Sequence, residues 1–147
     1  GHCTDAFRLG DRDLADTRAL KKAAKRAYDM AGIVDPREEI DFAEVYDAFS
    51  YMEPLWLEGL GICDDGKGCE YLERGWFDYG GKLPVNPSGG RLSANPVQAA
   101  GLYAMAEATL QLRGKAGKHQ VRGAGTALVH GINGMCGQSH CVWILGR

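Results

Sequence analysis

The sequence predicts an α/β fold, because stretches with helical periodicity alternate with short apolar runs typical of strands. The 147 residues, 45% apolar and 24% charged, suffice for one hydrophobic core but not for two. Glycine is the unusual component: 21 residues, eighteen of them after residue 58. The second half of the chain is therefore expected to contain many tight turns or close backbone approaches.

An apolar stripe predicts the first helix, with four basic residues on the opposite face. Asp11 or Asp13 is expected to cap its start, and Gly32 to end it. Asp35-Pro36 is then expected to break the chain. The stripe consists of Leu20, Ala23, Ala24, Ala27, Tyr28 and Ala31.

Residues 40–46 alternate well enough to predict a strand of about six residues. Residues 51–60 mix apolar and acidic side chains and predict a short helix. The long segment 61–90 shows little periodicity, apart from one or two helical turns expected within 69–74.

Residues 96–113 predict the next helix, with Pro96 in its first turn and Gly114 as its cap. Its apolar residues occupy nearly all faces, which indicates burial on most sides, either between layers or at a subunit interface. Strands are predicted at 126–130 and 139–145, joined by a glycine-rich turn at 131–137.

The overall composition argues against several classes of function. The net charge is −2 and no basic block exists, so nucleic acid is not an expected partner. The apolar runs are too short for a membrane span, and no segment resembles a signal peptide. Five cysteines without a regular framework indicate reduced thiols and a cytoplasmic location. Five residues separate Cys63 from Cys69, and no tight cysteine pairs occur, so no metal site is expected.

Two glycine-rich segments leave alternatives open. The turn at 131–137 is either a tight connection or a row of backbone N–H groups that cradles an oxyanion or a thioester. The run Ser88-Gly89-Gly90 is either a simple turn or a segment placed against the N-terminus of the following helix. A helix N-terminus stabilises developing negative charge.

The order of motifs is more specific than any single one. Glu44 to Phe49, Asn86 to Gly90, Asn95 to Gly101 and Gln111 to Gly114 are followed by the glycine-rich turn and a terminal strand. Together they resemble the C-terminal half of the thiolase superfamily, closest to the lipid-transfer (sterol-carrier) and archaeal types. The resemblance spans about residues 4–147. It implies a mixed sheet with helices on both faces, which would form half of a five-layered α/β/α/β/α arrangement.

The resemblance also implies an activity: an acyl-CoA acyltransferase that makes or breaks a C–C bond in a β-ketoacyl-CoA. The family's nucleophilic cysteine lies in an N-terminal half, which residues 1–147 do not include. The chain is therefore expected to act only with that half or with a separate catalytic subunit, in a homo- or hetero-oligomer. Coenzyme A is expected as substrate and no covalently bound cofactor. A small zinc-ribbon/OB-fold protein is a further partner that the resemblance implies.

Site residues follow from the same resemblance. Tyr46 occupies the place of the asparagine or histidine that holds the thioester oxygen, and a tyrosine hydroxyl can donate a hydrogen bond. Asn95 falls on or beside the place of the general-base histidine, and asparagine cannot take a proton. The family's second cysteine maps near Gly134, with Cys136 two residues on. His130 or His140 is a candidate replacement base. The expected acyl-CoA contacts are Ser88, Gly89, Gly90, Gly134 and Gly137.

Two alternatives remain beside the acyltransferase. Steroid side-chain aldolases resemble these thiolases and rely on tyrosines, so Tyr46 is compatible with a retro-aldolase acting on a β-hydroxyacyl-CoA. The chain could instead be a non-catalytic scaffold half that pairs with a catalytic chain. Whether it is a natural subunit or a fragment is left open by the sequence.

Overall fold

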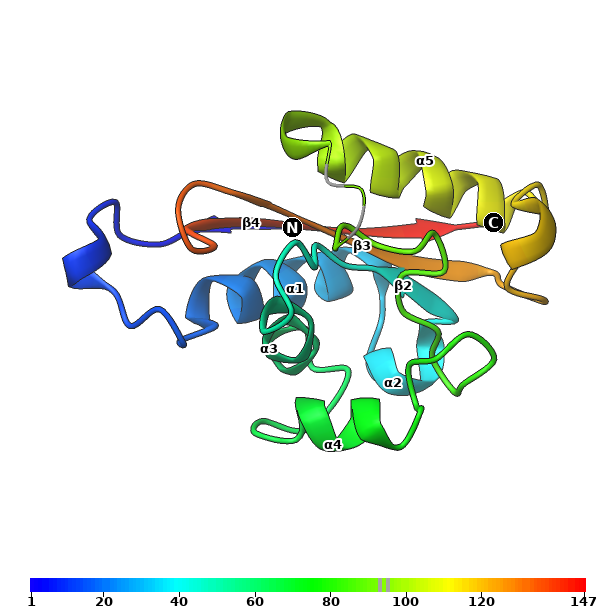
Figure 1. The fold of residues 1–147 in the computed structure, drawn as a ribbon, viewed down its shortest axis with the longest axis horizontal. Coiled ribbons are helices and arrows are strands. Elements are labelled where there is room, and N and C mark those ends of the chain that lie inside the picture. Colours follow the sequence, from blue (N-terminus) through cyan, green and yellow to red (C-terminus); the bar gives the residue numbers. More distant parts are fainter. Residues whose placement is uncertain (93, 95) are drawn as a thin grey trace.

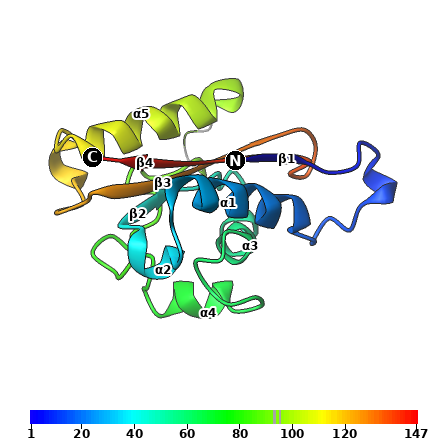
Figure 2. The same ribbon diagram turned by 180° about the vertical axis from the view of Figure 1, so that it is seen from behind.

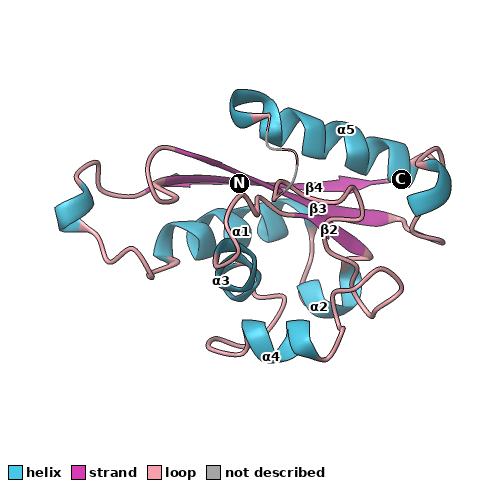
Figure 3. Cartoon of the chain, viewed as in Figure 1, coloured by secondary structure: helices cyan, strands magenta, loops and turns pink. Residues whose placement is uncertain are grey.

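A computed structural model covers residues 1–147 and describes all of them except Ser93 and Asn95. Four strands form one sheet in the order β1-β4-β3-β2 (Figures 1 and 3). β1 pairs with β4 and β4 with β3 in antiparallel fashion, whereas β3 and β2 run parallel. The mixed sheet that the resemblance implied is confirmed. The strands are β1 (His2–Thr4), β2 (Phe42–Glu44), β3 (Thr126–Asn133) and β4 (Ser139–Gly146).

Helices cover both faces of the sheet, as expected. The helix α5 (Ala100–Leu112) lies alone on one face, and the other four helices lie on the opposite face (Figures 1 and 2). Those four are α1 (Arg18–Ala31), α2 (Pro36–Glu39), α3 (Met52–Gly59) and α4 (Gly68–Glu73). The predicted helices at 51–60 and 69–74 thus appear within one residue or two of their expected bounds.

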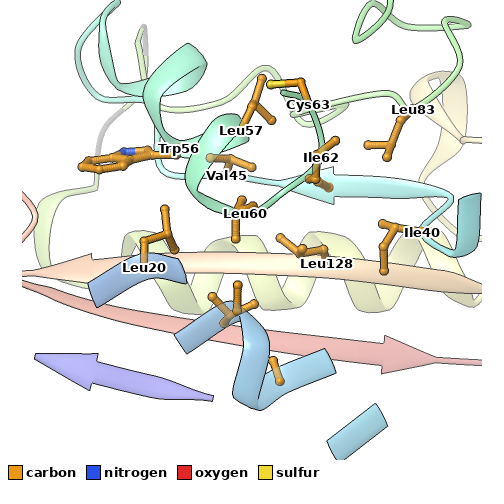
Figure 4. Close-up of a cluster of buried hydrophobic side chains, with 14 of the residues drawn as sticks. Leu20, Ile40, Val45, Trp56, Leu57, Leu60, Ile62, Cys63, Leu83 and Leu128 are labelled. Atoms are coloured by element: carbon orange, nitrogen blue, oxygen red, sulfur yellow. The ribbon is translucent and has the colours of Figure 1, made fainter. Parts of the chain in front are cut away.

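The larger hydrophobic core lies between the sheet and α1 and α3 (Figure 4). The alanines of the α1 stripe let this helix approach the strands closely, and Leu20 is fully buried. From α3 and the segment after it, Trp56, Leu57 and Leu60 fill the space against Leu128 of β3. Burying each such large side chain contributes roughly 1.5–3 kcal/mol relative to leaving it in water.

The expected cap of the first helix is wrong. The helix begins at Arg18, whereas Asp11 ends a short 3-10 turn, Leu9–Asp11, and Asp13 lies in the segment that follows. Asp16 instead accepts a hydrogen bond from the Arg18 backbone N–H at 2.8 Å. The predicted end is confirmed, because Gly32 follows the helix with a φ of +74°.

Two predicted strands differ in length from those observed, and one strand was not predicted. The strand expected at 40–46 is shorter and comprises Phe42–Glu44. Asp35-Pro36 starts α2, where Asp35 accepts a hydrogen bond from the Arg37 backbone N–H. The strand expected to end at His130 runs on to Asn133, and the following turn is correspondingly shorter. β1 was not anticipated, since three polar or small residues carry no recognisable pattern.

The expected burial of residues 96–113 on most sides is wrong within this chain. After a 3-10 turn at Val97–Ala99, α5 packs small residues such as Ala104 and Ala108 against the sheet. Its outer face is open among the described residues: Leu102 is 72% and Tyr103 61% exposed. One helix face meets the sheet, and no described element covers the other. The interpretation as an interface helix therefore stays a prediction.

Candidate active site

An open groove of about 700 Å³ lies between the start of α5 and the strands beneath it. The segment after β2 contributes Tyr46, α5 and the turn before it contribute mainly apolar side chains, and β3 and β4 form the floor. Gly131 leaves space between β3 and the start of α5, because a Cβ at this position would lie 3.4 Å from the Trp143 ring and 3.7 Å from the Gly101 Cα. The lining residues are Tyr46, Val97, Gln98, Gly101, Leu102, Met105, Gly131, Ile132, Asn133, Gly134, Ser139, Cys141 and Trp143.

Tyr46 reaches the groove because it lies just beyond the carboxyl end of β2, which runs parallel to β3. Ligands of α/β proteins commonly bind beyond the carboxyl ends of parallel strands. The side chain is half-buried and also packs against the edge of the larger core. Tyr46 is thus an amphipathic side chain in the lining of the groove.

Residues 86–91 are hydrogen-bonded to the end of β2, in part through the side chains of Glu44 and Asp47, which stand on either side of Tyr46 in the sequence. The Glu44 carboxylate accepts from the Ser88 backbone N–H at 3.1 Å and from its hydroxyl at 2.7 Å. The Asp47 carboxylate accepts from the Arg91 backbone N–H at 2.5 Å. The Asn86 side-chain oxygen also accepts from the Val45 N–H at 2.7 Å.

Glu44 is fully buried, and this burial raises the pKa of its carboxyl to about 7. The hydrogen bonds from Ser88 and the positive charge of Arg91 act in the opposite direction. Burial also raises the pKa of Asp47, against the hydrogen bond from Arg91. Two buried acidic groups and one buried guanidinium thus lie close together next to the end of β2.

The predicted Ser88, Gly89 and Gly90 lie together in this fastened segment and do not line the groove. Gly90 has a φ of +68°, and a Cβ on it would come within 2.1 Å of the Asp47 carboxylate. Only glycine lets the backbone pass the carboxylate this closely. Ser88 and Gly90 therefore support the segment that carries Tyr46.

His130 and His140 face the larger core rather than the groove. Their rings are 3.0 Å apart between Nε2 and Nδ1, and both pack edge-on against Trp56. Burial lowers the pKa of His140 to about 4 and that of His130 well below its ordinary value. Both rings are buried and neither lines the groove, so a molecule in the groove cannot reach them, and the geometry does not support their predicted role as bases.

Of the remaining predicted site residues, some line the groove and others do not. Gly134 lines the groove, whereas Gly137 packs beneath Trp56, whose ring a Cβ would approach to 2.7 Å. Cys136 is exposed in the turn after β3 and lies outside the lining of the groove. Asn95 lies outside the described residues.

Sequence reasoning missed Glu44, Asp47 and Arg91 as a group. Their signal was present: charged residues flank Tyr46 within an otherwise apolar run, and an arginine directly follows the glycine pair. Across the residues that the structure describes, no cluster of three histidine, cysteine or acidic side chains could hold a metal ion. Nor is any helix of that part both long and apolar enough to cross a membrane.

Comparison with known proteins gives a family match over the whole chain. A family model described as thiolase C-terminal domain-like matches residues 1–147. Sterol carrier protein 2 of Oryctolagus cuniculus is 47% identical over 113 residues, which cover 76% of this chain and 20% of that protein. The acetyl-CoA acetyltransferase of Methanothermobacter thermautotrophicus is 40% identical over 127 residues, which cover 86% of this chain and 33% of the relative.

A solved structure has the same fold. A chain of a protein described as Ltp2-ChsH2(DUF35) aldolase superposes with a TM-score of 0.72 at 26% sequence identity. The match covers 87% of this chain and 32% of that one. The present chain thus spans between about a fifth and a third of the proteins that it resembles.

Proposed function

Because this chain belongs to the thiolase C-terminal domain-like family, we propose that it forms one half of an active site that makes or breaks a C–C bond in an acyl-CoA thioester. The observation that carries the proposal is the position of Tyr46, on the wall of a 700 Å³ groove beside the start of α5. A thioester oxygen that gains negative charge needs hydrogen-bond donors and positive dipoles aimed at it. The Tyr46 hydroxyl and the N-terminal end of α5 can supply both.

The other half of the site is supplied by an N-terminal thiolase half, on the same polypeptide or on another. Two observations support this. The chain corresponds to a third or less of each relative compared above, and the outer face of α5 exposes large apolar side chains. Coenzyme A would enter as part of the substrate, with the acyl group in the mainly apolar groove.

The first candidate reaction is acyl transfer on a β-ketoacyl-CoA. In it, a cysteine thiolate of the N-terminal half attacks the keto carbon, the bond to Cα breaks, and the electron pair passes to the thioester enolate. A proton then converts the enolate to acetyl-CoA or an α-substituted equivalent. The thiol of free coenzyme A takes the acyl group from the cysteine, which forms the shortened acyl-CoA and returns a proton to the cysteine. In this scheme Tyr46 holds the thioester oxygen on which the negative charge develops.

The second candidate is retro-aldol cleavage of a β-hydroxyacyl-CoA. There, the β-hydroxyl loses its proton, the Cα–Cβ bond breaks to leave a carbonyl compound, and the thioester enolate is then protonated. The residues that line the groove in the described part of the chain include Tyr46 and Cys141 but no histidine, and the presence of a tyrosine favours this chemistry. So does the likeness to a structure described as an aldolase. A non-catalytic scaffold half is the remaining alternative.

Tyr46→Phe tests the site in the complete enzyme, that is, this chain together with its N-terminal half. The substitution removes one hydroxyl and is expected to lower kcat on the order of 100-fold, because it removes a donor or proton carrier from the reacting atoms. The measurement is turnover of a β-ketoacyl-CoA with free CoA and, separately, of a β-hydroxyacyl-CoA without it. The substrate that is consumed identifies the reaction.

Tyr79→Phe is the matched control. Its hydroxyl also makes a hydrogen bond, to the Gln120 carbonyl at 3.0 Å, but it lies outside the groove. Wild-type turnover in the Tyr46→Phe variant would show that the Tyr46 hydroxyl takes no part, whereas a loss confined to Tyr79→Phe would point to the hollow that Tyr79 borders. An intact enzyme that converts neither substrate would favour the scaffold.

A further inference from the structure

Arg91 is a buried arginine at the meeting point of three segments. Its side chain is 7% exposed. One guanidinium nitrogen, Nη1, donates to the Gly90 carbonyl at 3.2 Å. The other, Nη2, donates to the Ala100 carbonyl at 3.1 Å and lies 3.8 Å from the Glu44 carboxylate.

The backbone of Arg91 adds a fourth contact, since its N–H donates to Asp47. Glu44 and Asp47 stand on either side of Tyr46 in the chain, two residues before it and one after. Through these two carboxylates, the segment that ends in Arg91 fixes the chain on both sides of Tyr46. This defines one wall of the groove.

Ala100, whose carbonyl Arg91 binds, is the first residue of α5. The turn that follows contributes Gly101, Leu102 and Met105 to the opposite wall. The same side chain therefore donates a hydrogen bond to the start of α5 and forms an ion pair at 3.8 Å with Glu44, two residues before Tyr46. A guanidinium suits this task because it is planar and presents several donors in a fixed fork, whereas a lysine ammonium is a single point charge.

We propose that Arg91 is a positioning residue, which sets the distance between Tyr46 and the start of α5 and so the width of the groove at the reacting atoms. Its link to catalysis rests on the function proposed above. The positional role itself does not, because it concerns only the arrangement of two segments of this chain.

Hydrogen exchange in the complete enzyme tests the positional role. Arg91→Met keeps much of the side-chain length but no donor, so amides at 44–49 and 98–104 are expected to exchange at least tenfold faster. Because Arg91→Met leaves buried acidic groups without their cation, the double variant Glu44→Gln/Arg91→Met is measured as well. A glutamine can still bond Ser88 while it removes one charge.

Arg37→Met is the matched control. Arg37 also joins a carboxylate, Asp64 at 2.7 Å, to a backbone carbonyl, that of Gly61 at 3.3 Å, but it does not border the groove. Its loss is expected to leave exchange at 44–49 and 98–104 unchanged. If exchange in these two segments is the same in Arg91→Met and in its double variant as in the wild type, the positional role is refuted, whatever the activity.

Kinetics test the link to the reaction. A displaced reacting group lowers turnover more than binding, so kcat is expected to fall about 10- to 100-fold with a KM change of less than about threefold. Arg91→Lys, which keeps the charge but not the fork, is expected to give an intermediate kcat. A wild-type kcat in Arg91→Lys would show that the planar guanidinium is not required and that a positive charge is enough. If the complete wild-type enzyme has no activity, the proposed function is refuted. The positional role of Arg91 is then judged by hydrogen exchange alone.

Discussion

At the scale of single residues, two buried titratable groups, His140 and Glu44, change the stability of the fold with pH in opposite directions. The His140 pKa is lowered to about 4 by burial, against an ordinary value near 6.5, so only the unfolded state binds a proton between these pH values. Stability from this group is complete above pH 6.5 and is lost as the pH falls towards 4. The shift corresponds to about 3 kcal/mol at most.

Glu44 acts in the opposite direction. Its folded pKa of about 7 lies above the unfolded value near 4.5, so the folded state binds the extra proton in this range. Its contribution is complete below pH 4.5 and is lost as the pH rises through 7. Between pH 4.5 and 6.5 the two groups therefore partly cancel.

Two substitutions are expected to separate these effects. Glu44→Gln removes the opposing contribution, so the free energy of unfolding should fall more steeply from pH 6.5 to 4.5 than in the wild type. His140→Gln should make the fall shallower. Urea denaturation at a series of pH values measures how the free energy of unfolding changes with pH in each protein. The pH dependence is compared, and not the absolute stability, because His140 also packs against Trp56 and its loss changes stability at every pH. Parallel curves for all three proteins would contradict the assignment.

The sequence predicted Tyr46 as a site residue through its surrounding motif, and the structure places it at the groove. It did not predict the placement of the two histidines, although His130 alternates with Leu128 and Ile132, which face the larger core. The sequence shows Arg91 as an arginine after a glycine pair, but not its bonds to Ala100 and Glu44, which lie 9 and 47 residues away. Contacts over such distances depend on the fold.

At the scale of elements, α5 presents two chemically different faces. Small side chains meet the sheet, and large apolar ones such as Tyr103 and Leu110 point outward, seven residues apart on one stripe. The helix carries a pattern suited to burial on both sides, which explains why its sequence predicted more burial than this chain provides. An outer partner layer would bury that stripe.

Leu110→Glu tests this interpretation without touching the groove, which Leu110 does not line. A charge placed in an apolar interface is expected to weaken binding of the N-terminal half at least tenfold, about 1.4 kcal/mol. Titration of the separately expressed halves by calorimetry measures the affinity. Met30→Glu, on the exposed surface of α1, is the control that should bind normally. Equal affinities for the two variants would exclude the outer face of α5 as the interface.

Elements with strong periodicity were predicted well, and short ones poorly. The stripe predicted the existence and the end of α1, though not its start at Arg18, whereas α2 and β1, with four and three residues, are too short to show a period. β1 exists because it pairs with β4, and nothing within its own three residues requires a strand.

At the scale of the whole molecule, the α/β class followed from the alternation of elements, and the groove follows from the topology. β2 and β3 are the parallel pair, so the segment with Tyr46 emerges beside the floor that β3 and β4 provide. The start of α5 closes the third side, held there by Arg91. Among the described residues, no further element closes the groove, which is open to solvent on its remaining side.

The most direct test of this account is a structure of the complete enzyme with a non-cleavable acyl-CoA analogue bound. We predict that the acyl group occupies the groove, with the thioester or the β-oxygen within about 3 Å of the Tyr46 hydroxyl, as catalysis requires. The opposite end of β2 offers another hollow of about 530 Å³, beside Tyr79 and Arg122. An acyl group bound there, with no contact to Tyr46, would contradict the assignment of the site.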